Sequence, residues 1–134
     1  MRLLGLVMIV SLSLALLAGP SLAASKSEEA TARAAQDYLK HGLMLADGGE
    51  DEKAAASFQK AVSLSPDWAE ARSLLGSALS RAGKYKEAEE QLRKAVSLKP
   101  DYAEGWYYLG LFLKDRGKTK EAEEAFQKAK QLAR

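Results

Sequence analysis

The sequence predicts an all-α fold, a solenoid of helix-turn-helix hairpins, and two observations lead to this prediction. The stretch KAVSLSPDWAEA at residues 60–71 returns as KAVSLKPDYAEG at residues 94–105, 34 positions later. A fixed displacement shared by many residues indicates a repeated structural unit. Within the repeat, apolar residues recur at helical spacing, and glycine or proline separates the apolar runs.

Dividing the chain after the proline of each repeated stretch gives three consecutive blocks of 34 residues: 33–66, 67–100 and 101–134. Blocks two and three are identical at 16 of 34 positions, and blocks one and two at 11. Unrelated helices do not reach this identity by chance. We therefore expect the repeats to fill the chain from about residue 35 to residue 134.

Residues 1–23 have a different composition from the rest of the chain. One basic residue, Arg2, precedes an apolar run at 3–17, and a Gly-Pro pair and small residues follow it. This order is typical of a secretory signal peptide, and the run is shorter than the roughly 20 residues of a membrane-spanning helix. We expect cleavage after Ala23 and a periplasmic or secreted protein. The alternative is an uncleaved segment that anchors the protein in a membrane.

The first helix of the repeat region is expected to be the longest. Ser25 and Glu28 have the spacing of a capping box, with Ser25 as the N-cap. Nothing that would break a helix follows before Ala46. Residues 24–34 are therefore predicted to extend the first helix by about two turns beyond the repeat domain at 35–134.

Each block is expected to hold two helices and a turn. In block three, Trp106, Leu109 and Leu113 share one face of a first helix, and Ala122 and Phe126 share one face of a second. A residue in the left-handed conformation ends a helix tightly, and glycine adopts it most easily. Glycines stand between the two helices of every block: Gly48-Gly49, Gly83 and Gly117.

The repeated stretch covers the joint between one block and the next. Pro66 and Pro100 are predicted to end the second helices, because proline cannot continue a helix. The aspartates that follow, Asp67 and Asp101, are predicted to cap the next first helices. The duplication is thus the point where one hairpin leads into the next.

The repeat pattern resembles the tetratricopeptide repeat, which has a 34-residue period with W-x2-L-G-x2-Y, then A-x3-F, then P. The residues at these positions are Tyr38, His41, Gly42, Leu45, Ala54, Phe58 and Pro66 in block one, Arg72, Leu75, Gly76, Leu79, Ala88, Leu92 and Pro100 in block two, and Trp106, Leu109, Gly110, Leu113, Ala122 and Phe126 in block three. The resemblance implies a right-handed α-solenoid with repeats at about 35–68, 69–102 and 103–134.

Three residues depart from the family pattern. Arg72 replaces a large apolar residue, His41 replaces leucine, and Arg134 stands where proline is usual. We expect His41 to be partly buried at a packing position. We expect Arg72 to lay its aliphatic stem on the apolar seam and to keep its guanidinium in water.

The composition argues against catalysis, a metal site and nucleic-acid binding. The chain has no cysteine and one histidine, so thiolate metal sites and most histidine-based catalysis lack their residues. The 20 basic and 18 acidic side chains are interleaved rather than gathered on a basic face. The acidic residues at 47–52 lack the alternation of a calcium loop, and those at 87–90 and 121–124 are spaced to pair with basic residues. We expect no enzyme, no metal and no cofactor.

The resemblance implies that a partner segment binds in a concave groove formed by the first helices. The groove positions are held by Gln36, Leu39, Lys40, Leu43, Glu70, Ser73, Leu74, Ser77, Glu104, Tyr107, Tyr108, Leu111 and Lys114. Only Lys40 and Lys114 are basic, so the clamp with which some members grip a terminal carboxylate is absent as a set. Tyr107 is the preferred anchor, and Tyr108 is expected to pack internally.

The sequence therefore predicts a non-catalytic protein-interaction module that works outside the cytoplasm as a scaffold or assembly factor. Its expected ligand is a protein or peptide segment with apolar anchors. Lys130 replaces Val62 and Val96 of the earlier blocks, and a more polar end repeat is typical of a finished array. This replacement predicts a monomer. The alternative is a structural subunit of an envelope complex whose array ends mediate self-association.

Overall fold

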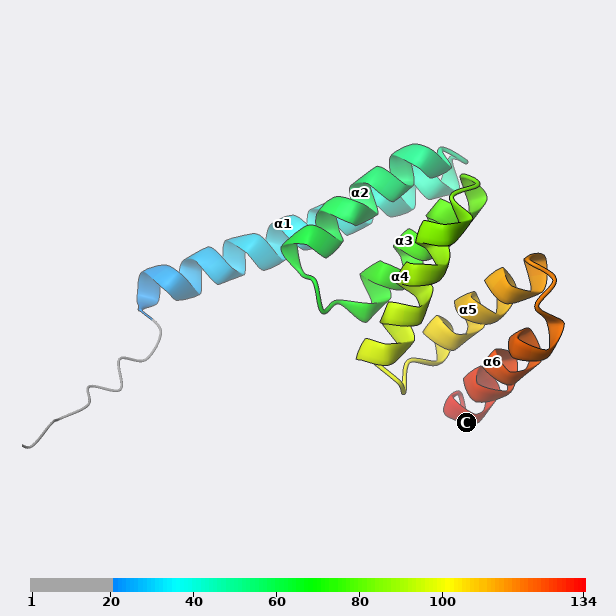
Figure 1. Ribbon diagram of the computed structural model, residues 1–134. Coiled ribbons are helices and arrows are strands. Elements are labelled where there is room, and N and C mark those ends of the chain that lie inside the picture. The colour runs from blue at the N-terminus through cyan, green and yellow to red at the C-terminus, as the bar shows by residue number, and fades with distance from the viewer. Residues whose placement is uncertain (1–20) are drawn as a thin grey trace, which may run out of the picture.

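A computed structural model describes residues 21–134, so the predicted signal peptide lies almost wholly outside the described residues. All regular structure in the described part is α-helical, which confirms the predicted class (Figure 1). The helices are α1 Leu22–Asp47, α2 Asp51–Leu64, α3 Ala69–Arg81, α4 Tyr85–Leu98, α5 Ala103–Asp115 and α6 Thr119–Leu132. They form three successive hairpins, as the repeat predicts.

The hairpins stack so that each first helix packs on the hairpin before it. Helix α3 contacts α2, and α5 contacts both α3 and α4. A single apolar cluster runs through all three hairpins, with Phe58, Leu75, Leu92 and Leu113 almost completely buried. This stacking is needed because a single hairpin cannot bury its apolar faces alone.

Glycine shapes each hairpin at two places. Gly49, Gly83 and Gly117 end the first helices with φ of 76°, 81° and 77°. Inside each hairpin, another glycine lets the two helices approach. A Cβ atom on Gly42 would lie 2.6 Å from the Phe58 ring, too close for any real contact. The repeated glycines are therefore required by the backbone and by the packing.

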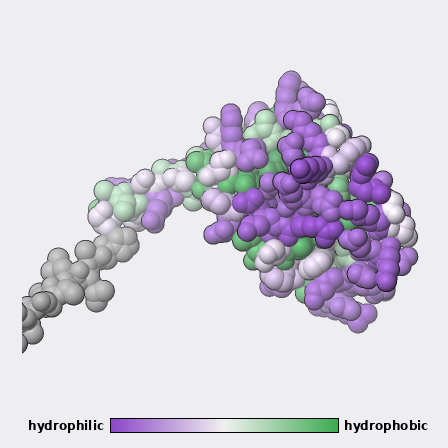
Figure 2. Space-filling model, in the orientation of Figure 1, coloured by the Kyte–Doolittle hydropathy of each residue, from purple (hydrophilic) through white to green (hydrophobic). Residues whose placement is uncertain are grey.

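Helix α1 begins earlier than the sequence predicts. The N-cap is Ser21, whose hydroxyl accepts a hydrogen bond of 3.2 Å from the Ala24 N–H, so the prediction of Ser25 as the cap was wrong. Helix α1 has 26 residues, whereas α3 and α5 have 13 each. Its first part projects from the array (Figure 1), and hydrophilic residues alternate there with residues of weak hydropathy (Figure 2).

The aspartates after the prolines do not cap helices, which corrects a second expectation. Helix α3 begins at Ala69 and α5 at Ala103, each without a side-chain cap. The Trp68 N–H instead donates to the Ser65 carbonyl oxygen at 3.1 Å, which closes a turn around Pro66 and Asp67. Proline and aspartate are both favoured in such a turn. The aspartate therefore lies within the turn and not at the N-cap position of the next helix.

Two of the three departures from the repeat pattern, His41 and Arg72, can be compared with expectation. His41 is exposed on α1, because no hairpin precedes α1 within residues 21–134. Arg72 is partly exposed, and its guanidinium is also hydrogen-bonded. Its Nε donates to the Pro66 carbonyl oxygen at 2.8 Å, as Trp106 Nε1 donates to Pro100 at 2.9 Å. Arginine therefore replaces the indole by supplying an N–H donor at the same place.

Candidate functional site

Two adjoining pockets lie along the first helices of the hairpins, with volumes of ≈ 210 and ≈ 170 Å³. Both pockets are lined by Ser77, Arg81 and Tyr108, so they adjoin and together make one candidate site. We call it the central groove. Its other lining residues include Leu43, Ala46, Asp47, Phe58, Leu74, Ser80, Leu92, Leu111, Phe112 and Asp115.

The central groove is lined by both apolar and polar side chains, and one ion pair lies at its edge. Leu43 on α1 and Leu111 on α5 are both 38% exposed, and half-buried Tyr108 lies between the two pockets. The Arg81 guanidinium is held by Asp51 through an ion pair of 2.7 Å. Apolar side chains with a few oriented polar groups are typical of a site that binds a peptide segment.

The structure brings some of the predicted groove residues together. Leu43, Ser77, Tyr108 and Leu111 line the central groove, together with Leu74. The exposed Gln36, Lys40, Glu104 and Lys114 and the half-buried Leu39 and Glu70 do not line it. Arg81 was missed, although it follows Ser77 by four residues and therefore shares its helical face. That spacing could have identified it.

Ser73 corrects the prediction that it is a groove residue. Its side chain is completely buried, and its hydroxyl has no hydrogen-bond partner among the described residues. A Cβ atom on Gly105 of α5 would lie 3.4 Å from this hydroxyl. Helix α5 therefore covers Ser73, and no partner can reach it.

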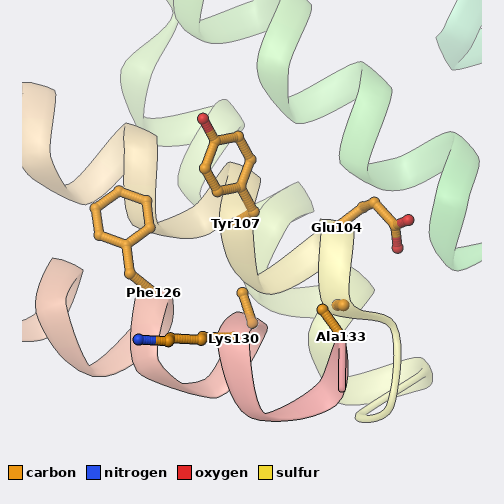
Figure 3. A pocket seen from close by; sticks show the side chains of 7 residues that line it. Glu104, Tyr107, Phe126, Lys130 and Ala133 are labelled. Carbon is orange, nitrogen blue, oxygen red and sulfur yellow. The ribbon is translucent and has the colours of Figure 1, made fainter.

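Tyr107 lies in a different cavity from Tyr108. A depression of ≈ 410 Å³ between α5 and α6 is lined by Ala103, Glu104, Tyr107, Phe126, Ala129, Lys130 and Ala133. We call it the trailing groove (Figure 3). The Tyr107 ring is 50% exposed, and its centroid lies 5.7 Å from that of Phe126. The residue preferred as the anchor thus belongs to the end of the array.

Two side chains between these grooves have shifted pKa values. Burial raises the pKa of Glu70, but the hydrogen bond of 2.6 Å from Lys99 and its charge outweigh burial, so the pKa lies below its usual value. Burial, with nearby carboxylates, raises the pKa of Tyr102 to about 12. Tyr102 is therefore neutral near neutral pH, with the Lys99 ammonium 5.4 Å from its ring centroid. Lys99 thus contacts both Glu70 and Tyr102, and so links α3 to the start of the third hairpin.

Two further features were sought among the described residues: a cluster of metal ligands and a membrane-spanning helix. Residues 21–134 contain no group of three or more histidine, aspartate or glutamate side chains placed to hold a metal ion. No helix in this range is long and apolar enough to cross a membrane.

The stacked hairpins and the central groove define a helical-repeat protein of the α-solenoid class. A family model described as tetratricopeptide repeat matches residues 73–134, and a second, described as TPR repeat, matches residues 42–83. The array of residues 42–134 therefore belongs to the tetratricopeptide repeat family. No curated protein matched the chain in sequence.

Solved structures of this family superpose on most of the chain. The second TPR of Spaghetti (RPAP3) bound to the HSP90 peptide SRMEEVD has a TM-score of 0.72 at 20% identity, over 80% of this chain and 98% of that one. The Sgt2 TPR domain from Aspergillus fumigatus has a TM-score of 0.71 at 26% identity, over 74% and 66%. MamA has a TM-score of 0.67 at 26% identity, over 82% and 67%. The likeness to the first structure shows the fold alone.

Proposed function

We propose that this protein is a non-catalytic interaction module that binds a partner protein segment in the central groove. The supporting observation is that two pockets adjoin through Ser77, Arg81 and Tyr108 and are together lined by residues of all three hairpins. A groove of this kind suits an amphipathic helix or an extended segment. One chain supplies the whole groove, so we propose that the binding unit is a monomer.

The chemistry of the groove favours apolar anchors over an acidic terminus. The RPAP3 domain that resembles this chain is bound to an HSP90 peptide ending in EEVD. Here Arg81 is already paired with Asp51, and Asp47 and Asp115 also line the groove. A strongly acidic peptide would meet these carboxylates, whereas leucine or aromatic side chains would bury Leu43 and Leu111. We therefore propose a ligand with apolar anchors.

The N-terminal segment supports a location outside the cytoplasm. Its order of basic, apolar and small residues is the basis for proposing export, followed by action as a scaffold or assembly factor in a bacterial envelope. Retention of the segment would instead anchor the module at a membrane.

The proposal can be tested with peptides selected from a random library on the immobilised protein. Truncating a buried aromatic anchor commonly costs about 2 kcal/mol, which is roughly thirtyfold in affinity. We expect Tyr108→Ala and Leu111→Ala to weaken the selected peptide, Tyr108→Ala by about thirtyfold. Fluorescence anisotropy measures the affinity, and circular dichroism checks the fold of each variant.

Two matched controls make the test specific. Tyr107→Ala removes a neighbouring tyrosine outside the central groove and should change peptide affinity far less than Tyr108→Ala. Glu123→Ala removes an exposed charge on α6 and should change it very little. The proposal fails if Tyr108→Ala and Leu111→Ala bind fully while charge reversal on α2, α4 or α6 abolishes binding.

A further inference from the structure

The trailing groove repeats a surface that is covered in the other two hairpins. Phe126 and Ala129 correspond to Leu92 and Ala95 in the second hairpin, which are 1% and 0% exposed. Tyr107 corresponds to Ser73, which α5 covers. In the third hairpin, Tyr107 and Phe126 stand side by side (Figure 3), with Tyr107 50% exposed and Phe126 partly buried. The trailing groove is therefore one half of a hairpin joint whose other half is missing from residues 21–134.

The opposite end of the array carries the other half of such a joint. Asp37, His41 and Met44 are spaced by four and three residues, so they share one face of α1. We call this the leading face. The matching residues of α3 and α5 are Ala71, Leu75, Ala78, Gly105, Leu109 and Phe112, and all of them are buried. Met44, in contrast, is 73% exposed. The leading face thus corresponds to the docking face of α3 and α5, and no hairpin lies over it within residues 21–134.

The polar substitutions at the two ends have opposite charges. Lys130 in the trailing groove replaces Val96, and Asp37 on the leading face replaces Gly105. Val96 and Gly105 are both buried where the second and third hairpins meet. An ammonium thus replaces a buried residue at one end of the array and a carboxylate replaces one at the other, and opposite charges on two docking surfaces are complementary.

From these observations we propose that the trailing groove binds the leading face of a second copy of this chain, so that chains associate head to tail. Helix α1 of the second copy takes the place on α5 and α6 that α3 takes on the first hairpin. Met44 covers the Tyr107 and Phe126 rings, and Asp37 pairs with Lys130. Such an interface joins different surfaces, so association continues beyond a dimer unless the ring closes.

The association is weaker than an internal joint. His41 stands where Leu75 and Leu109 stand in the internal joints, and burying polar groups lowers the gain from apolar contact. Because the association is weak, we expect a monomer at low concentration, as the sequence predicts. Oligomers should form only at high concentration. The inference does not depend on the proposed function, because the central-groove residues Ser77, Arg81 and Tyr108 take no part.

A charge exchange tests the pairing. Asp37→Lys and Lys130→Glu change exposed residues at opposite ends, so neither should alter the melting curve. Sedimentation equilibrium over a concentration series measures the average mass. We expect the unaltered protein to exceed the mass of two chains at high concentration. Each single variant should need about tenfold more protein for the same mass, the factor that corresponds to 1.4 kcal/mol.

Mixing the two variants provides the decisive control. Where unlike variants meet in an equimolar mixture, the lysine introduced by Asp37→Lys faces the glutamate introduced by Lys130→Glu. In the next joint along the chain of molecules, the unaltered Asp37 of the Lys130→Glu variant faces the unaltered Lys130 of the Asp37→Lys variant. Both kinds of joint therefore pair opposite charges. We expect the mixture and the double variant to recover the association of the unaltered protein within about twofold. A retained N-terminal apolar segment would cause aggregation that does not depend on these charges. Mass spectrometry is therefore used to determine the N-terminus of each protein sample.

Tyr107→Ser, which copies Ser73, gives a second variant on the apolar side of the same surface. It should also reduce association while leaving the central-groove peptide bound. The proposal is contradicted by an unaltered protein that stays monomeric at every concentration, by single variants that associate normally, or by a mixture that fails to recover.

Discussion

Phe58 and Phe126 hold the same place in the first and third hairpins but have different surroundings. A Cβ atom on the facing glycine, Gly42 or Gly110, would lie 2.6 Å from either ring, so the packing inside the two hairpins matches. Phe58 is nevertheless 1% exposed, whereas Phe126 is only partly buried. The difference is the next hairpin, which covers Phe58 and has no counterpart over Phe126 in residues 21–134. Stacking, rather than the hairpin alone, completes the core.

Removing the third hairpin should have the largest effect on the stability of the stacked hairpins. A chain that ends at Pro100 exposes Leu92 and Val96, as the end of the array now exposes Phe126. Because repeats contact only their neighbours, two hairpins fall below the number that usually gives a stable stack. We expect loss of a cooperative thermal transition by circular dichroism. A truncated chain that melts as sharply and at the same temperature as the parent would refute the stacking account.

Truncating the two phenylalanines should produce unequal losses of stability. Phe58→Ala is expected to cost about 4 kcal/mol, within the range for a fully buried aromatic side chain. Phe126→Ala should cost about half as much, roughly 2 kcal/mol, because less apolar area is buried there. Urea unfolding at equilibrium measures both values. Equal losses would mean that the cover from the next hairpin contributes little.

Arg72 and Trp106 occupy equivalent positions in the second and third hairpins, so their contributions to stability can be compared. Arg72→Ala removes hydrogen bonds of 2.8 Å to Pro66 and to Gln91, and should cost about 1–2 kcal/mol. Arg72→Trp should cost less, because the indole N–H makes the equivalent bond in the third hairpin. Urea unfolding compares the two variants. If Arg72→Trp is the more destabilising, the two side chains are not equivalent at this position.

The ion pairs between the second and third hairpins should give the smallest effect. Burial raises the pKa of Glu89, but hydrogen bonds from Arg93 and Lys118 outweigh burial and leave the pKa below its usual value of 4.5. A lowered folded pKa stabilises the protein above the unfolded pKa, and this stability is lost as pH falls through the folded pKa. We expect less than about 1 kcal/mol, because the pairs are partly exposed.

A matched variant isolates this contribution. Glu89→Gln should reduce the free energy of unfolding at pH 7 and flatten its decline in acid, relative to the parent. The corresponding residue in the first hairpin is Ala55, so no equivalent pair supports the first joint. An unchanged acid profile in Glu89→Gln would show that Glu89 does not contribute to the pH dependence.

The hairpins could be predicted from sequence because their determinants are local. The positions of Gly83 and Gly117 and the apolar spacing depend only on residues close in the chain. The caps at Asp67 and Asp101 were wrong because the turn after proline competes locally for the same aspartates. His41 and Ser73 could not be placed, since their exposure depends on whether another hairpin lies over them. The burial of His41 and Ser73 was therefore set by their position within the array and not by their residue type.

The same reason separates Tyr107 from Tyr108 in the candidate site. Both are on α5, but one points to the end of the array and the other lines the central groove. Their order in the sequence does not reveal this difference. Leu43 and Leu111 line the central groove and are both 38% exposed, because neither lies under another hairpin, and their role in binding stays a prediction.

The most direct test of the proposed function is a map of the ligand on the protein. Two-dimensional NMR of the isotopically labelled protein, with and without a library-selected peptide, reports which backbone amides respond. The account predicts that the largest shifts cluster on α1, α3 and α5 around Leu43, Ser77 and Leu111. Shifts confined to the outer helices α2, α4 and α6 would contradict it.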